Sequence, residues 1–149
     1  MKKLILFILI PFFIACSDDD SNNNNAGSFL DEYNGVIWLD DANDENYEFW
    51  WIFTPDGVTD GERYYDDCDT WYIEWGELND DYSVDVVENT SNRLEIMIID
   101  YVTDTNGNPI THSKSMTFTV SSDGNTLTAT YNDGTGDTET YSRSDNSPC

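Results

Sequence analysis

The feature that most constrains this chain is a series of short alternating or apolar runs, broken by turn-forming residues at regular spacing. The turns include "TPDG", "TNGNP", "SSDGN" and "NDGTGD", whose residues suit tight hairpins. Many short strands with polar turns predict an all-β domain. We expect an antiparallel up-and-down barrel of about eight or nine strands, over 35–39, 47–53, 58–65, 70–75, 82–88, 93–102, 113–120, 126–132 and 138–143. One helical turn is expected over 28–35, capped by Ser28.

Alternation along these runs predicts one apolar, aromatic face. Side chains two residues apart share a face of a strand. The run 47–53 therefore puts Tyr47, Phe49, Trp51 and Phe53 on one side. The runs 70–75, 113–120 and 126–132 continue the pattern, with threonines and acidic residues opposite.

Several of these segments resemble the small lipocalin-like domains of bacterial lipoproteins. The matching features are "NGVIW", with Gly35 and Trp38, the turn Phe53-x-x-Asp56-Gly57, and the closing strands "TLTATYNDGTGDTETYSR". The resemblance implies a barrel domain over 29–149, with Trp38 on its floor and Arg143 packed on that ring. It also implies an interior wide enough for one small apolar ligand. The lining would be Trp38, Phe49, Trp51, Phe53, Trp71, Trp75 and Phe118. The alternative is that these side chains simply fill the core.

A second functional hypothesis is a cell-surface module that binds glycans. Trp50 and Trp51 are adjacent and must point to opposite faces of their strand. Trp50, together with Tyr72, would then form an exposed aromatic platform on which sugar rings stack.

The N-terminus predicts export and lipidation. Met1-Lys2-Lys3 is a basic start, and the apolar run "LILFILIPFFIA" is too short to span a bilayer. Ala15 before Cys16 resembles the lipobox of bacterial lipoprotein signal peptides. This resemblance implies a signal peptide over 1–15 and lipid, including palmitate, on Cys16 as the membrane anchor. The alternative is a general secretory peptide with a chance cysteine.

Residues 16–28 form an acidic, asparagine-rich tether that we expect to be disordered. Its Ser17-Asp18-Asp19-Asp20 segment resembles the surface-export signals of some Gram-negative outer-membrane lipoproteins. The expected location is therefore the outer membrane, on the cell surface. The alternative is a plain soluble linker, which would leave the periplasmic face open.

The charge of the mature chain argues against nucleic acid as a partner. Loss of residues 1–15 removes both lysines there and no acid, which leaves four basic residues against 30 acidic ones, a net charge of −26. Phosphate binding needs Lys and Arg. We expect a monomer attached to the membrane only through its lipid.

Two cysteines remain after Cys16, namely Cys68 and Cys149, and an exported protein favours a disulfide between them. Free thiols are the alternative, because sequence alone does not establish the geometry.

Catalytic patterns are lacking in the sequence. His112 is the one histidine and has no partner histidine or nucleophile elbow, so we expect no enzyme, no cofactor and no metal site. The segment "DTNGNP" lacks the later residues of a calcium-binding loop and predicts a hairpin turn. Calcium in the acidic loops is the alternative, through Asp40, Asp41, Asp44, Asp66, Asp67 and Asp69.

Overall fold

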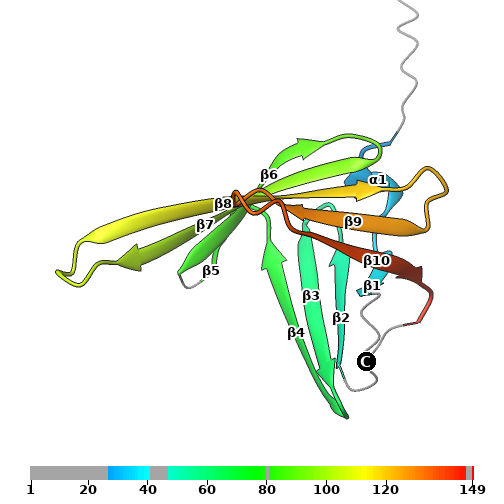
Figure 1. Cartoon of the computed structure of the whole chain (residues 1–149), viewed down its shortest axis with the longest axis horizontal. Helices are drawn as coiled ribbons and strands as arrows, with labels where there is room; N and C mark the ends of the chain where they lie inside the picture. Colours follow the sequence, from blue (N-terminus) through cyan, green and yellow to red (C-terminus); the bar gives the residue numbers. More distant parts are fainter. Residues whose placement is uncertain (1–26, 41–46, 80, 147–148) are drawn as a thin grey trace, which may run out of the picture.

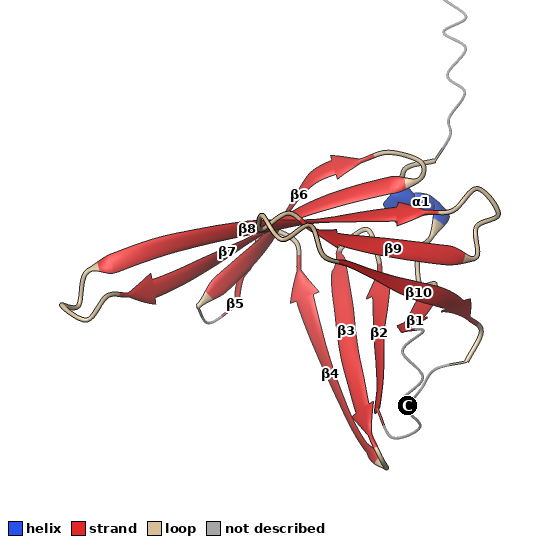
Figure 2. Cartoon of the chain, viewed as in Figure 1, coloured by secondary structure: helices blue, strands red, loops and turns tan. Residues whose placement is uncertain are grey.

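A computed structural model of the chain describes residues 27–40, 47–79, 81–146 and 149. Strands dominate it, with one short helix at one end (Figure 2). The elements are α1 (Phe29–Glu32), β1 (Ile37–Asp40), β2 (Tyr47–Phe53), β3 (Gly57–Tyr64), β4 (Asp67–Glu74), β5 (Leu78–Asn79), β6 (Tyr82–Asn89), β7 (Arg93–Thr103), β8 (Pro109–Val120), β9 (Thr126–Tyr131) and β10 (Thr138–Ser144).

All strand pairs are antiparallel and form one sheet in the order β4-β3-β2-β1-β10-β9-β8-β7-β6-β5. Consecutive strands pair with each other, except that β4 and β5 form the two edges of the sheet. In addition, β1 pairs with β10 and so joins the two ends of the domain. Where β4 ends, the Gly76 N–H donates to the Val84 carbonyl of β6 over 2.8 Å. The sheet is thus a nearly closed up-and-down barrel, which confirms the predicted fold class. The two-residue strand β5 was not predicted.

Helix α1 closes one end of the barrel, here called the helix end (Figure 1). The Ser28 side chain accepts from the Asp31 N–H at 3.3 Å, as an N-cap does. The Phe29 N–H donates to the Thr90 carbonyl in the β6–β7 turn at 2.6 Å, which fixes the helix to the barrel. Phe29 is fully buried, and its ring meets that of Phe53 edge-on at 5.4 Å between centroids.

The inward face fills the barrel from the helix end to about its middle. Phe53 and Phe118 are both fully buried with ring centroids 4.8 Å apart, and Trp51 stacks beside Phe53 at 6.1 Å. Burial of a side chain of this size stabilises the fold by about 1.5–3 kcal/mol. The same core contains Trp38, Tyr33, Val58, Val84, Leu94, Ile96, Met116, Val120, Leu127, Ala129 and Tyr141.

Toward the other end, here called the open end, strands β2 to β4 and the β7–β8 hairpin diverge (Figure 1). The edge strand β4 is consequently exposed along nearly its whole length, with only Ile73 buried. Near this end the inner side chains of Tyr47 and Phe49 are half-buried and that of Glu139 is exposed.

The structure places Cys68 of β4 and the terminal Cys149 at disulfide distance, with Cα atoms 6.1 Å apart. The bond closes a loop across 81 residues of sequence. The predicted signal peptide, Cys16 and most of the tether lie outside the described residues. Within the described ranges, no helix has the length and apolarity needed to cross a bilayer.

Candidate ligand-binding site

Three of the seven residues predicted to line an apolar cavity are core residues. Trp38, Phe53 and Phe118 are fully buried, and both phenylalanine rings contact other aromatic rings. Interiors pack to the density of organic crystals, so side chains in such contact leave no room for a ligand between them. For this half of the barrel, core filling is the correct alternative. Arg143 lies opposite Trp38 on the neighbouring strand.

The other four predicted lining residues are spread over different surroundings. Trp51 is 9% exposed and forms the upper layer of the core, whereas Phe49 is half-buried above it at 5.2 Å between ring centroids. Trp71 is 46% exposed on edge strand β4. Trp75 is half-buried, and its indole N–H donates to the Thr54 carbonyl at 3.1 Å, so this side chain stabilises the β2–β3 turn. Of these four residues, Phe49 lines the pocket described below.

The predicted glycan platform is wrong for Trp50. Trp50 does point to the opposite face from Trp51, but it is only 1% exposed. Gly61 is its cross-strand partner, and a Cβ atom built there would overlap the indole ring. Trp50 therefore lies flat over a strand glycine, an arrangement that buries an aromatic ring on an outer face. Tyr72 is 53% exposed but has no exposed partner in Trp50.

A pocket opens at the open end of the barrel, where β1, β2, β9 and β10 lie side by side. Its volume is about 240 Å³. We call it the mouth pocket and define it by its six lining residues, Asp40, Tyr47, Phe49, Tyr131, Glu139 and Tyr141. Four are aromatic and two are acidic. The sequence predicted Phe49 as a ligand contact and Asp40 as a calcium alternative, and its alternation placed Tyr47 and Tyr131 on the inward aromatic face. Glu139 and Tyr141 were not predicted as site residues.

Glu139 organises two walls of the mouth pocket. Its Oε2 atom accepts hydrogen bonds from the Tyr131 hydroxyl at 2.9 Å and from the Tyr141 hydroxyl at 2.6 Å. Burial, then the hydrogen bond to Glu139, and then the charges of Glu139 and Asp40 raise the pKa of Tyr131 to about 12. Burial and the same carboxylate raise the pKa of Tyr141 as well. Both phenols therefore remain neutral donors at physiological pH.

Tyr47 also donates a hydrogen bond to a carboxylate, in this case that of Glu62 on β3. Its hydroxyl donates to Oε2 of Glu62 at 3.0 Å. Burial raises the pKa of Tyr47 first, followed by the hydrogen bond to Glu62 and the charges of Glu62, Asp40 and Glu139. The negative charges of the carboxylates around the pocket thus contribute to the raised pKa of each of its three tyrosines.

Two polar atoms below the pocket lack hydrogen-bond partners within the described part of the chain. They are the indole nitrogen of Trp51 and Oδ1 of Asp60, both buried. These residues are cross-strand neighbours on the inner face. The indole N–H is close enough to the Tyr141 hydroxyl to oppose the rise in its pKa, but the geometry is not that of a hydrogen bond. Burial raises the pKa of Asp60, the hydrogen bond from its own backbone N–H opposes this rise, and the charge of Glu62 adds to it.

A larger hollow of about 490 Å³ lies against the outer part of the β7–β8 hairpin. It involves the exposed side chains of Tyr101, Val102 and Ile110. Its lining has one acidic residue, Asp81, and no cluster of charged side chains. It therefore indicates a ligand class less clearly than the mouth pocket does.

Metal chemistry finds no support in the described residues, where no group of three or more His, Cys, Asp or Glu side chains is placed to hold an ion. Asp104 instead accepts from the backbone N–H groups of Asn106 and Asn108, each at 2.8 Å, which makes "DTNGNP" the predicted hairpin turn. His112 is exposed on β8. Asp41 and Asp44, two of the calcium alternatives, lie outside the described residues.

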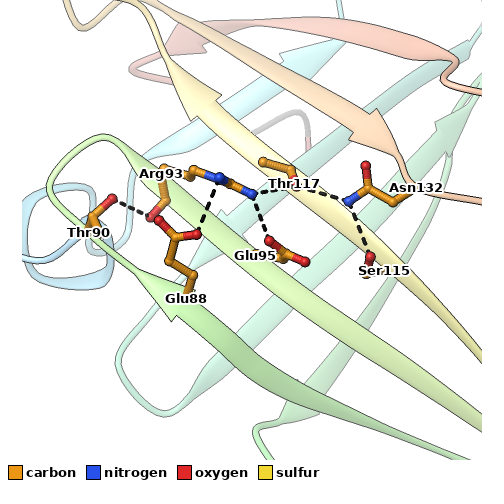
Figure 3. Close-up of polar contacts among 7 residues, drawn as sticks. All are labelled: Glu88, Thr90, Arg93, Glu95, Ser115, Thr117 and Asn132. Carbon is orange, nitrogen blue, oxygen red and sulfur yellow. Dashed lines mark hydrogen bonds and ion pairs between the residues drawn. The ribbon is translucent and has the colours of Figure 1, made fainter.

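The outer face of β6 to β9 carries a separate polar network (Figure 3). Arg93 forms ion pairs with Glu88 at 3.3 Å and Glu95 at 2.7 Å, and Asn132 donates to Ser115 and Thr117. These contacts pair the charges of Arg93 with two carboxylates, although the Nε atom of Arg93 has no hydrogen-bond partner among the described residues. The network is therefore structural, and its carboxylates are suitable controls for those of the mouth pocket.

Comparisons with family models, with curated proteins and with solved structures found no match to this chain. The functional argument therefore rests on the residues themselves.

Proposed function

We propose that this protein is a lipid-anchored lipoprotein of the Gram-negative cell envelope whose lipocalin-like barrel is a non-enzymatic binding module. The N-terminal pattern that ends in Ala15 and Cys16 supports lipidation. The acidic segment Asp18–Asp20 supports display on the outside of the outer membrane. The lipid holds the domain, since its net charge would be repelled by an anionic membrane surface.

One observation carries the binding part of this proposal: the helix end is packed with aromatic side chains, whereas the open end has a pocket of about 240 Å³. Ligand sites are concave and combine aromatic walls with a few placed polar groups. The mouth pocket has this composition, so a small molecule would bind there and not in the filled interior.

Lipid anchoring is tested by labelling cells with an alkyne analogue of palmitate. The wild-type protein should carry the label and fractionate with the outer membrane. Cys16→Ala should carry none and should be found uncleaved or released, because the thiol that accepts the lipid is gone. Ser17→Ala is the matched control and should behave as wild type. Label that persists on Cys16→Ala would refute lipidation at this residue.

A further inference from the structure

The mouth pocket combines features that suit one chemical class of ligand. We propose that it binds a small organic cation, a substituted ammonium ion such as a choline-sized molecule. This inference rests on the proposed function, because it names the ligand of that same pocket.

The first argument is the uncompensated negative charge. Both hydrogen bonds to Glu139 fall on Oε2, which leaves Oε1 without a hydrogen bond from the described part of the chain. No basic side chain of the described residues forms an ion pair with Glu139. The Glu139 side chain is exposed at the mouth of the pocket, so an organic cation that enters the pocket can pair with its charge.

The basic residues of the domain are engaged elsewhere. Arg63 pairs with Glu48 at 2.6 Å, and Arg93 pairs with acids on the outer face. Lys114 acts on Asp133, and Arg143 acts on Tyr33 at the helix end. None of the ion pairs among the described residues reaches the lining carboxylate of Glu139.

The second argument is the aromatic wall. Phe49 and Tyr141 face the pocket with ring centroids 6.4 Å apart and planes inclined by 52°. The face of an aromatic ring attracts a cation, and this attraction is stronger where water is excluded. Aromatic walls with a carboxylate are the usual recognition chemistry for alkylated ammonium groups.

Other ligand classes fit less well. An anion would be repelled by Asp40, Glu62 and Glu139. An uncharged apolar ligand would cover the lining carboxylate of Glu139 without pairing with its charge. Calcium takes six to eight oxygen ligands, whereas four of the six lining side chains here present aromatic rings.

The test is isothermal titration calorimetry on the full lipoprotein in non-ionic detergent, with three probes. These are choline, its uncharged isostere 3,3-dimethylbutan-1-ol, and calcium chloride. We expect saturable choline binding that is at least tenfold tighter than binding of the isostere, and that weakens as salt is added. Calcium should not displace choline at equal concentration.

Three variants make the test specific to the mouth pocket. Glu139→Gln keeps an acceptor for the two tyrosines but removes the charge, and it should weaken choline binding at least tenfold. Phe49→Leu keeps an apolar side chain but removes the π face, and it should weaken binding severalfold. Glu95→Gln, on the outer face, is the matched control and should bind as wild type. Thermal melting verifies that each variant is folded.

The outcomes separate the two proposals. Equal affinity for choline and its isostere would overturn the cation and leave a small-ligand function standing. If neither probe binds, or if Glu139→Gln binds choline as tightly as wild type, the cation inference is overturned. The lipid anchor is tested separately, by palmitate labelling. Displacement of choline by calcium would identify the site as a metal site instead.

Discussion

Gly61 determines where Trp50 lies, and its replacement by alanine is a direct test of the sheet packing. The new Cβ would overlap Cζ2 and Cε2 of Trp50 and would lie 2.8 Å from the indole nitrogen. One of two responses must follow: the indole leaves its position, or the strands shift around it.

The magnitudes decide between these responses. Release of the indole would expose roughly 150–250 Å² of buried surface, which at about 25 cal/mol per Å² costs about 4–6 kcal/mol. Overpacking of a well-packed site costs about 1–3 kcal/mol. We therefore expect Gly61→Ala to keep the indole buried, to displace β2 against β3, and to lower the free energy of unfolding by about 1–3 kcal/mol.

Urea unfolding followed by tryptophan fluorescence measures this cost. Gly27→Ala is the matched control, since a Cβ there would meet the Cβ of Asp31 at an ordinary 3.7 Å. A double-mutant cycle isolates the contact: in a Trp50→Ala background, Gly61→Ala should cost less than about 0.5 kcal/mol. Gly61→Ala that is as stable as wild type would refute the packing of Trp50 on Gly61 and restore an exposed Trp50.

Three further predictions concern the core, one buried acid and the disulfide. Phe118→Ala should lower the free energy of unfolding by about 3–5 kcal/mol, because the ring is fully buried against Phe53 and leaves a cavity; a loss below about 1 kcal/mol in urea unfolding would contradict a filled interior. Burial raises the pKa of Asp60 in the folded state. The free energy of unfolding is therefore unaffected by this raised pKa below about pH 4 and falls as pH rises through it. Asp60→Asn should therefore be more stable than wild type at neutral pH, by on the order of 1 kcal/mol after solvent screening, and thermal melts from pH 3 to pH 8 should show the difference vanish at low pH; a constant difference would argue against this titration. Cys149→Ser should reduce stability by about 2–5 kcal/mol under oxidising conditions and by nothing in excess dithiothreitol; equal melting temperatures without reductant would mean that the bond contributes nothing.

The barrel was predictable from sequence because its signals are local. Alternation over 47–53 gives β2 with the same bounds as in the structure, and Ser28 and the turn residues mark where elements begin and end. The two-residue strand β5 was missed, since Leu78 and Asn79 are too short a run for any period. The first residues of β8, from Pro109 to His112, were also missed, because a two-stranded arm outside the core has no apolar face to form a pattern.

Contacts between strands were not predictable from single runs. Trp50 on the outer face was expected to be exposed, and only its register with Gly61 buries it. A glycine inside a strand was the available signal, as it often marks a close approach of another group. Whether Phe53 and Phe118 surround a cavity or fill it depended on how the sheet curls, and a strand pattern does not specify that.

The mouth pocket was partly within reach of the sequence. In "TETYSR", period-two alternation places Glu139 on the same face as Tyr141 and Arg143, which puts an acid on the inward side of the strand. That inward acid was the signal for a polar site. Its pairing with Tyr131 and its closeness to Phe49 needed the order β2-β1-β10-β9, which becomes known only with the fold.

The most direct test of the account is the place at which an organic cation binds. Aromatic ¹H–¹³C NMR spectra of the full lipoprotein in detergent micelles, recorded during a choline titration, report this place residue by residue. The account predicts saturable shifts of the ring signals of Tyr47, Phe49, Tyr131 and Tyr141, with Phe53 and Phe118 unchanged. Shifts centred on the two core phenylalanines, or no saturable shift at all, would contradict it.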